Sequence, residues 1–405
     1  MYEVEKIRSQ FPSLSVNADS ESLVYLDNTA TTQTPESVIE RITEGYEKFK
    51  ANVHRGVHSL SQSATARMEA TRERVKKYIN AESIEEIIFT SGATESINLI
   101  ATSLGELIPE GSEIILTVME HHANIVPWQL LQSRKNITIK VVDINERGEL
   151  KIDQYKELFS PRTILASFCH VSNVLGTVNP VKEMVKIAKE HGAYTVIDGA
   201  QGPGHVMVDV KDIGCDFYAF SAHKMYGPTG VGVLYGRKEL LEKMPPYQGG
   251  GEMIRNVSFS GTTFADLPFK FEAGTPNFVD IAAFEKSFDL LESAAFRGAE
   301  KYETDLLRFA ESELRSRIPN IRIFGEAKRK SAILSFMIGD VHPYDVGMLL
   351  DGLGIAVRTG HHCAQPLMDR LGIPGTVRAG IACYNTEEEI KRFIKATERV
   401  AGMLS

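Results

Sequence analysis

The sequence lacks several features that would mark particular classes of protein. Only 4 of its 405 residues are cysteine, and no two of them form a Cys-x-x-Cys pair, which fits a reducing compartment better than a disulfide framework. No apolar run reaches the roughly 18 to 20 residues that span a bilayer, and the first residues lack the apolar core of a secretory signal. We therefore expect a cytoplasmic protein that does not bind membranes.

Positive charge is also in short supply. The chain has 45 Lys and Arg residues against 53 Asp and Glu residues, a formal net charge of −8. Domains that bind nucleic acid usually carry a basic face, so we do not expect nucleic acid as a partner. The 43% of hydrophobic and 24% of charged residues are ordinary for a soluble globular protein, and the length allows two or three domains.

Internal repeats and low-complexity tracts are missing as well, and short apolar runs instead alternate with amphipathic segments between about residues 85 and 236. Several runs are nearly continuous in apolar character, as strands covered on both faces are. This alternation predicts an α/β fold with a mixed, mostly parallel sheet between helices. The predicted strands cover residues 87–90, 112–117, 138–142, 163–168, 194–197, 216–220 and 232–235.

The remainder of the chain predicts a second, smaller α+β region. A helical stretch over 280–317 precedes three further strands, and the sequence closes with an amphipathic helix over 387–403. We predict a large domain over 21–280, a small domain over 281–405, and an N-terminal segment, 1–20, that joins the small domain. The three further strands lie near 322–324, 332–337 and 377–382.

One lysine directly follows the apolar run at 216–220, in Ser221-Ala-His-Lys224-Met-Tyr-Gly227. Sheets of this kind bind ligands at the carboxyl ends of their strands, so Lys224 is a candidate for a Schiff base with a carbonyl cofactor. An exposed lysine before a turn is the ordinary alternative, but Ser221 and His223 beside it offer donors for an anion. A nucleotide-binding loop is disfavoured, because the glycines precede a strand instead of opening a helix.

An acid ends another apolar strand, in Val196-Ile-Asp198-Gly-Ala-Gln201. Alone, Asp198 would be interpreted as a helix cap or turn residue. Together with Lys224 it meets the two requirements of a pyridoxal phosphate site, a lysine for the covalent link and a carboxylate that keeps the ring nitrogen protonated. Thr90-Ser-Gly-Ala-Thr94 adds a glycine turn and a helix start, whose free N–H groups suit a phosphate.

Two pairs of adjacent histidines occur, His121-His122 after a predicted strand and His361-His362 before Cys363. The first pair lies at the expected ligand edge, so one of its rings can stack on a flat cofactor. A metal site is the alternative. We expect no metal, because neighbouring side chains on a strand point in opposite directions and no His-Glu-x-x-His or Cys-x-x-Cys spacing accompanies these residues.

The four cysteines differ in their surroundings. Cys169, Cys215 and Cys383 lie in or beside apolar runs, where buried and unreactive thiols are expected. Cys363 lies in the polar, glycine-containing segment Arg358-Thr-Gly-His-His-Cys-Ala-Gln-Pro366. A nearby cation and exposure favour a thiolate, so Cys363 is the candidate nucleophile.

These segments together resemble the SUF-type cysteine desulfurases, which with the selenocysteine lyases form a branch of the class V aminotransferase group. The resemblance covers nearly the whole chain and implies the fold type I of pyridoxal-phosphate-dependent transferases. Its specific motifs are Tyr25-Leu-Asp-Asn-Thr-Ala30, Asn52-Val-His-Arg-Gly-Val-His58, Met119-Glu-His-His-Ala-Asn-Ile-Val-Pro127, the Lys224 segment, Phe271-Glu-Ala-Gly-Thr-Pro-Asn277 and the Cys363 segment.

The resemblance implies a role for each candidate site residue. It identifies pyridoxal 5'-phosphate as the cofactor, Lys224 as its covalent attachment, Asp198 as the partner of the ring nitrogen and His121 as the residue that stacks on the ring and helps to move protons. Gln201 is implied to bind the phenolic oxygen. The residues implied to hold the phosphate are Thr94, Ser221 and His223 of one subunit and Thr275 of the other.

The resemblance also implies the substrate and the partners. L-Cysteine is implied to bind through Asn173 and Arg378, with Arg358 near the nucleophile, and to leave as alanine once its sulfur has moved to Cys363 as a persulfide. The protein is implied to be a homodimer whose sites are lined by His54 and Arg55, and to pass sulfur to an acceptor protein of iron–sulfur cluster assembly.

Other functions remain open on the same residues. Selenocysteine lyase or cysteine-sulfinate desulfinase activity would need Cys363 less, and a transaminase would give it no task. A non-catalytic sulfur carrier on this fold is a different class of function, against which the Lys224 and Asp198 pair speaks.

Overall fold

The large region is built on a seven-stranded sheet in the order β4-β10-β9-β8-β7-β5-β6. The computed structural model describes residues 2–15, 17–18 and 21–404. β5 to β9 run parallel, and β10 is antiparallel to both of its neighbours. The strands are β4 (Ile87–Thr90), β5 (Glu113–Thr117), β6 (Thr138–Val142), β7 (Thr163–Cys169), β8 (Tyr194–Asp198), β9 (Phe217–Ser221) and β10 (Gly232–Gly236). Each predicted strand and the predicted α/β class are confirmed.

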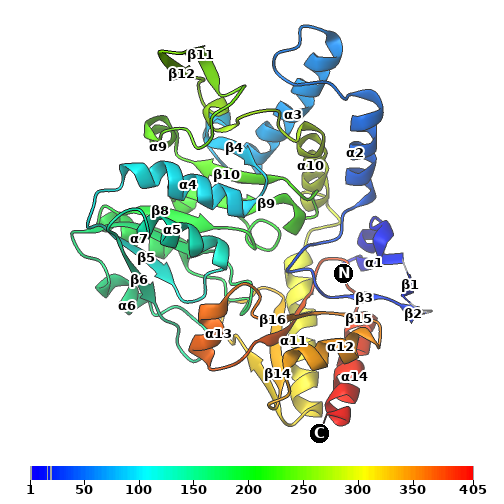
Figure 1. Cartoon of the computed structure of the whole chain (residues 1–405). Coiled ribbons are helices and arrows are strands. Elements are labelled where there is room, and N and C mark those ends of the chain that lie inside the picture. The colour runs from blue at the N-terminus through cyan, green and yellow to red at the C-terminus, as the bar shows by residue number, and fades with distance from the viewer. Residues whose placement is uncertain (1, 16, 19–20, 405) are drawn as a thin grey trace.

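Helices cover both faces of this sheet, as Figure 1 shows. In β4, Ile87 and Phe89 join the core beneath α3 (Ser59–Tyr78), α7 (Val181–Glu190) and α10 (Phe278–Leu291). Ile88 points the other way, into the core beneath α4 (Ala93–Leu107) and α5 (Val126–Gln132). Because successive strand residues face opposite sides, a strand between two helical layers must be apolar throughout.

The C-terminal region holds a four-stranded antiparallel sheet in the order β13-β14-β17-β16. Its strands are β13 (Ile321–Phe324), β14 (Ile333–Ile338), β17 (Thr376–Gly380) and β16 (Arg358–Gly360), and α11 (Ala299–Arg317), α12 (Pro343–Asp351) and α14 (Glu387–Met403) accompany them. A separate hydrophobic core joins this sheet to the helices. The predicted smaller α+β region and its closing helix are confirmed.

The N-terminal chain runs along both regions. β3 (Val24–Tyr25) pairs in parallel with β15 (Ile355–Ala356), and Val24 lies in the C-terminal core. Upstream, Phe11 packs with residues of both regions, among them Tyr226 and Tyr384. Residues 1, 16, 19 and 20 of the predicted segment 1–20 lie outside the described part of the chain, and the boundaries at 20 and 280 stay predictions.

The helical stretch predicted over 280–317 is wrong as a single element. α10 ends at Leu291, and α11 begins at Ala299 after Gly298, which has a φ of +89°. This left-handed conformation interrupts a helix, and glycine adopts it readily.

A hairpin of β11 (Ile254–Ser258) and β12 (Gly261–Phe264) was not predicted, because its residues are nearly all exposed and show no buried pattern. The other elements are α1 (Val4–Arg8), β1 (Asn17–Ala18), β2 (Glu21–Ser22), α2 (Glu36–Lys48), α6 (Ile152–Glu157), α8 (Val210–Ile213), α9 (Lys238–Lys243) and α13 (Gln365–Leu371). Among the described residues, every helix is too short or too polar to cross a membrane.

Candidate active site

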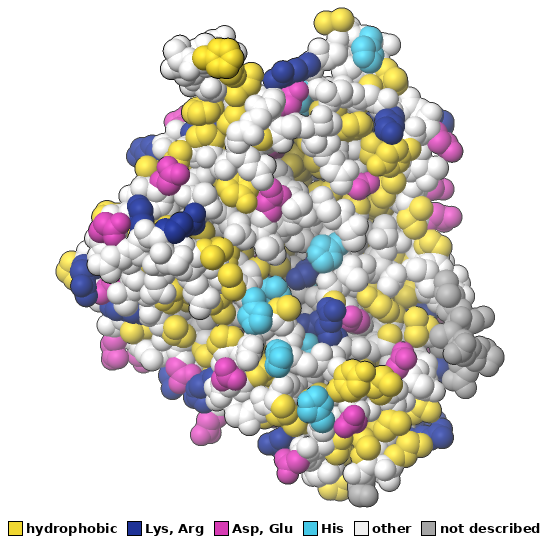
Figure 2. All heavy atoms as spheres, viewed as in Figure 1, with side chains coloured by type: hydrophobic (Ala, Val, Ile, Leu, Met, Phe, Trp, Pro, Cys, Tyr) yellow, Lys and Arg dark blue, Asp and Glu magenta, His cyan; other side chains and the backbone are white. Residues whose placement is uncertain are grey.

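A cavity of about 510 Å³ lies where the carboxyl ends of the central strands meet the C-terminal region. Figure 2 shows a hollow in the middle of one face, with histidine and cationic side chains gathered around it. The sequence-predicted residues that line the cavity are Thr94, His121, Asn173, Asp198, Gln201, Ser221, His223, Lys224, Arg358, Cys363 and Arg378. The fold thus brings together residues separated by more than half of the chain.

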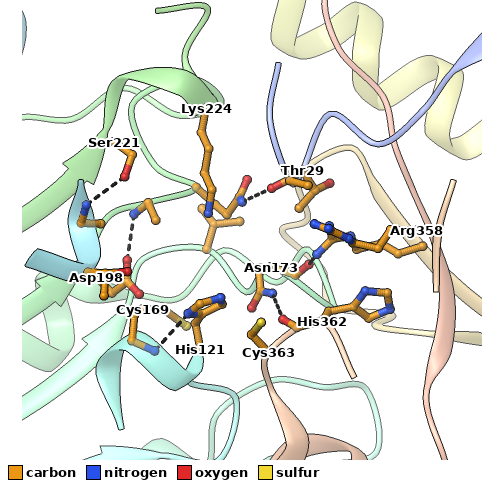
Figure 3. A pocket seen from close by; sticks show the side chains of 18 of the residues that line it. Thr29, His121, Cys169, Asn173, Asp198, Ser221, Lys224, Arg358, His362 and Cys363 are labelled. Carbon is orange, nitrogen blue, oxygen red and sulfur yellow. Dashed lines mark hydrogen bonds between the residues drawn. The ribbon is translucent and has the colours of Figure 1, made fainter. Parts of the chain in front are cut away.

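Three neighbouring strands deliver polar groups to the same edge. β7, β8 and β9 end at Cys169, Asp198 and Ser221, and Cys169 and Asp198 are direct partners in the parallel ladder. The single helical turn Ala222–Lys224 then turns the lysine toward the cavity. In Figure 3, Lys224 reaches toward the middle of the cavity, between Asp198 and Arg358.

The first turn of α4 forms an anion cradle at the end of β4. The Ala93 N–H donates to Ser221 Oγ at 2.8 Å, which joins the helix start to the segment that holds Lys224. Ala93 and Thr94 line the cavity, and the N–H groups of a first helical turn have no partners within the helix. A Cβ on Gly232 would lie 2.3 Å from the Gly92 Cα, so the cradle can approach β10 only where glycine occurs.

Asp198 and Lys224 are buried groups of opposite charge, and each affects the pKa of the other. Burial raises the pKa of the Asp198 carboxyl, and the cation of Lys224 partly offsets that rise. Burial lowers the pKa of Lys224, and Asp198 acts in the opposite direction. A buried carboxylate needs a cation to stay ionised, and a desolvated lysine becomes a better base and nucleophile.

His121 is held as a neutral ring. Its Nδ1 accepts the Ala123 N–H at 3.0 Å, so in the neutral ring the proton belongs to Nε2. Burial, followed by the charge of Lys224, lowers its pKa to about 4. Its neighbour His122 does not line the cavity and instead forms hydrogen bonds with the loop that carries Cys363.

Cys363 lies on a tightly held loop and is the one exposed cysteine. His362 and Cys363 have φ values of +53° and +55°, an uncommon left-handed conformation for two successive residues that are not glycine. The His122 N–H donates to Cys363 O at 2.6 Å, and the Gln365 N–H donates to His122 Nε2 at 3.1 Å. The loop is thereby fixed to the large region with its thiol on the cavity wall.

Two arginines lie opposite the sheet edge. Arg378 is buried, donates from Nη1 to Asn173 O at 2.9 Å and lies 3.5 Å from Asp27. Its Nε has no hydrogen-bond partner, and burial lowers its pKa to about 10. Arg358 is half exposed and lies 3.9 Å from Asp27. A buried guanidinium with a free donor is suited to a small carboxylate.

Asp27 and Glu120 had no role assigned from the sequence, although both lie in motifs quoted for the resemblance. His362, beside the candidate nucleophile, holds the Cys363 loop through Thr376 Oγ1 at 2.9 Å. Glu120 is fully buried and accepts from Thr117, Asn124 and the backbone N–H of Cys169. Burial raises its pKa to about 7. Two partners of Glu120 are its neighbours in the sequence, whereas the partners of Asp27 and His362, Arg378 and Thr376, lie on β17 and are identified only by the tertiary structure.

Three predicted residues lie outside the cavity. Thr275 is exposed on the turn that precedes α10. His54 Nε2 lies 3.1 Å from Glu69, and Arg55 pairs with Glu252 at 2.9 Å. The described chain also has no group of three or more His, Cys, Asp or Glu side chains arranged to hold a metal ion.

Comparison with known proteins agrees with this geometry. The family profile described as "Aminotransferase class-V" matches residues 24–393. A cysteine desulfurase of Pectobacterium carotovorum subsp. carotovorum (strain PC1) is 47% identical over 405 residues, which are 100% of this chain and 99% of the relative. The chain belongs to the cysteine desulfurases of the class-V aminotransferase family. The family resemblance seen in the sequence is therefore confirmed.

Two solved structures share the fold. The apo structure of a cysteine desulfurase from Thermococcus onnurineus NA1 is 38% identical, with a TM-score of 0.93 over 98% of both chains. A C-DES variant with glycine covalently linked to its PLP cofactor has a TM-score of 0.83 at 22% identity, over 97% of this chain and 98% of that one.

Pyridoxal 5'-phosphate is the cofactor of this class-V chain, and the cavity meets its requirements. A buried acid and the lysine line the same cavity, and a helix start supplies N–H groups. Gln201 Nε2 donates one N–H to Thr29 O at 2.6 Å, which leaves its second N–H for an oxygen of the cofactor. Ring, phosphate and carbonyl groups of the cofactor each have residues of fitting chemistry.

The contact between Gly232 and Gly92 generates a first prediction. Gly232→Ala should raise the dissociation constant for pyridoxal phosphate about tenfold or more, because the added Cβ forces the cradle away from β10. Titration of the purified protein followed by visible absorption measures this constant. Gly402→Ala, whose Cβ meets open space, is the matched control, and equal affinity in the two variants would contradict the prediction.

Proposed function

We propose that this cysteine desulfurase converts L-cysteine to L-alanine and keeps the sulfur as a persulfide on Cys363. The observation that carries the proposal is the position of Cys363, exposed on the wall of the cavity that also holds Lys224. Cys169 lines the same cavity but is buried, and burial raises the pKa of its thiol. Cys215 and Cys383 are buried as well.

Different residues of the chain bind different parts of the cofactor. Pyridoxal phosphate, when bound, withdraws electrons from the α-carbon of an attached amino acid. We infer that Asp198 binds the ring nitrogen, His121 covers the ring face and Gln201 binds the phenolic oxygen. Thr94, Ser221 and His223 then bind the phosphate at the start of α4.

Lys224 has two tasks, covalent attachment of the cofactor and proton transfer at the substrate. Both need the neutral amine, which the burial of Lys224 favours. Its location on a short turn directly after β9 keeps the amine inside the cavity.

The substrate carboxylate binds opposite the sheet edge. The free Nε of Arg378 and the amide of Asn173 are the donors, with Arg358 nearer to the mouth of the cavity. Asn173 Nδ2 also donates to His362 O at 2.8 Å. One amide thus connects the carboxylate site to the loop that carries the nucleophile.

Sulfur transfer needs the thiolate of Cys363. A new S–S bond forms between its Sγ and the sulfur of the substrate, and the C–S bond of the substrate breaks with its electron pair left on carbon. A proton then completes alanine. The balance is L-cysteine and a thiol in, L-alanine and a persulfide out.

A homodimer and a sulfur acceptor complete the proposal. Val57, Val257 and Phe259 are 93%, 64% and 116% exposed on two projecting segments, and Figure 2 shows hydrophobic side chains at both tips. A second copy of the chain would cover them and bring Thr275, His54 and Arg55 to the neighbouring site. The exposed thiol of Cys363 suits delivery to an acceptor protein of iron–sulfur cluster assembly in the cytoplasm.

Lys224→Ala tests the attachment of the cofactor. Turnover of L-cysteine should fall about a thousandfold or more, because both the covalent link and the positioned base are lost. Borohydride reduction of the native protein, followed by peptide mass spectrometry, should label Lys224. A label on another lysine would contradict this assignment.

Cys363→Ser tests the transfer step. The variant should lose the persulfide and most cysteine turnover but keep the visible absorption band of the cofactor, because Lys224 is unchanged. Selenocysteine turnover should fall less, since selenium can leave without attack by a thiol. Alkylation and peptide mapping after exposure to L-cysteine locate the sulfur, and full cysteine activity in Cys363→Ser or sulfur on Cys169, Cys215 or Cys383 would overturn the mechanism.

Mixed dimers test the composite site. A Lys224→Ala subunit combined with a Thr275→Ala subunit should contain one fully native site, because each subunit supplies what the other lacks. Affinity purification with two tags isolates the mixed species, and its cysteine turnover should be about half that of the native dimer. A fully active monomer in sedimentation experiments would refute the proposal.

A further inference from the structure

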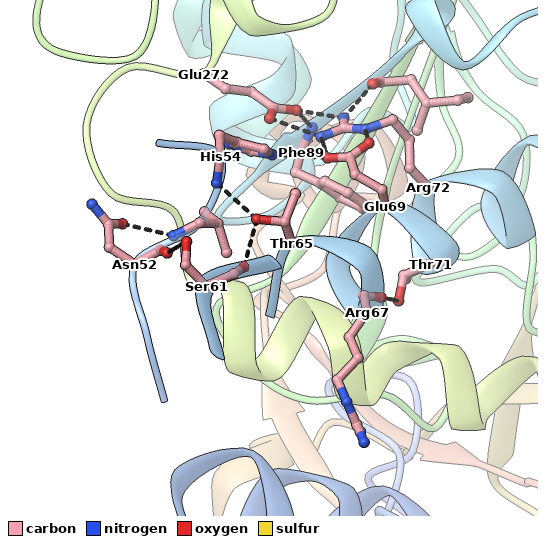
Figure 4. Close-up of polar contacts among 12 residues, drawn as sticks. Asn52, His54, Ser61, Thr65, Arg67, Glu69, Thr71, Arg72, Phe89 and Glu272 are labelled. Atoms are coloured by element: carbon pink, nitrogen blue, oxygen red, sulfur yellow. Dashed lines mark hydrogen bonds and ion pairs between the residues drawn. The ribbon is translucent and has the colours of Figure 1, made fainter. Parts of the chain in front are cut away.

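Arg72 of α3 is a fully buried cation at the free edge of the large sheet. Every N–H of its guanidinium group is used. Nε and Nη2 donate to Glu69 at 2.8 and 3.1 Å, Nη1 and Nη2 donate to Glu272 at 2.7 and 2.9 Å, and Nη1 also donates to Ile87 O at 2.7 Å. Figure 4 shows this arrangement. Such bidentate pairs fix the relative position of the segments that they join.

The pair of Arg72 and Glu272 takes the place of a neighbouring strand. β4 is the last strand of the sheet, so its outer edge has no partner strand. Glu272 Oε1 accepts the Phe89 N–H at 2.7 Å, while Arg72 binds the carbonyl of Ile87. One carboxylate and one guanidinium thereby satisfy the edge of the strand that leads into the anion cradle.

Glu272 also lies three residues before Thr275. Gly274 between them has a φ of +82°, and its N–H donates to Gly251 O at 2.9 Å. Phe271 is buried on one side of the turn and Val279 of α10 on the other, whereas Thr275 is exposed. The turn between these buried residues is therefore short, and Glu272 is the charged side chain that anchors its first half by hydrogen bonds.

The same guanidinium reaches a second segment. Glu69 lies 3.1 Å from His54 Nε2, and the His54 N–H donates to Thr65 Oγ1 at 2.8 Å. The ring of His54 packs edge-on against Phe269 at 4.8 Å. Arg72 thus connects the cradle of its own site to the two segments that, in the composite site, serve the neighbouring subunit.

We propose that Glu272, held by Arg72, is a positioning residue that sets Thr275 for the cofactor phosphate of the neighbouring subunit. The inference rests on the composite site of the proposed function. Its distinguishing consequence is that a change at Glu272 acts in the other subunit.

Glu272→Gln is the informative substitution. The amide oxygen can still accept the Phe89 N–H, so the cradle of the same subunit is retained, and Arg72 keeps Glu69 as a partner. The amide group, however, cannot accept both guanidinium N–H groups, so the turn that carries Thr275 loses its fixed anchor.

Two mixed dimers separate the contributions of the two subunits. In each dimer only one site keeps Lys224, so only that site gives the visible band of lysine-bound cofactor. When Lys224→Ala and Glu272→Gln are in the same subunit, the intact-lysine site receives the altered turn, and its dissociation constant for pyridoxal phosphate should rise about tenfold. When they are in different subunits, that site receives a native turn and should bind as in the native protein.

The controls separate the inference from its foundation. Asp289→Asn removes a carboxylate of α10 that pairs at 3.1 Å with Arg74, which lies on α3 as Arg72 does, and this variant should change neither site. Thr275→Ala, placed in the same two arrangements, should reproduce the pattern of Glu272→Gln. Glu272→Asp, which keeps the charge but shortens the side chain, replaces Glu272→Gln if that variant does not fold.

Each outcome has one interpretation. If Glu272→Gln weakens pyridoxal phosphate binding equally in both arrangements, Glu272 does not position the turn. The same follows if Glu272→Gln weakens binding in neither arrangement while Thr275→Ala acts across subunits. Either result would overturn the inference and leave the composite site intact. If Thr275→Ala itself fails to act across subunits, the composite site of the proposed function is wrong and the inference is overturned with it.

Discussion

The architecture of the site depends on one constraint, that a charge buried in a protein must have a partner of opposite charge or lose its ionisation. Asp198 ends β8 and Lys224 lies on the turn after the adjacent strand β9, and the charge of each partly offsets the pKa shift that burial causes in the other. The strand register brings the two residues together, because parallel strands that are in step end at one edge. A cationic ring nitrogen bound by Asp198 would serve as the partner that this carboxylate needs.

The nucleophile is positioned by a different principle, the fixing of an uncommon backbone conformation by hydrogen bonds from outside the loop. His362 and Cys363 are both left-handed, and the bonds that hold them come from His122, Asn173 and Thr376. These partners belong to both halves of the chain. An exposed loop would ordinarily leave its thiol mobile, but these hydrogen bonds give the thiol of Cys363 a defined position on the cavity wall.

The Arg72 cluster extends the same electrostatic constraint to the edge of the sheet. A guanidinium with no exposure is tolerated because Glu69 and Glu272 accept from it in a bidentate way. This arrangement satisfies the outer edge of β4, and in our proposal the same ion pair also positions the segment of Thr275. A buried ion pair of this kind adds specificity of position more than stability.

The sequence by itself determined the strands of the large sheet, because strands covered on both faces leave runs such as Ile87-Ile88-Phe89 that no amphipathic helix shows. It also determined the chemical types at strand ends, Asp198, Ser221 and Lys224, since these follow the runs directly. Local pattern could not reveal the break at Gly298 or the exposed hairpin β11–β12, because neither leaves an apolar period. Only the tertiary structure decided the partners across the chain: Asp27 with Arg378, His122 with the Cys363 loop, and Arg72 with Glu272, which are 200 residues apart in the sequence. These contacts depend on which segments the packed layers bring together, and sequence spacing carries no information on that.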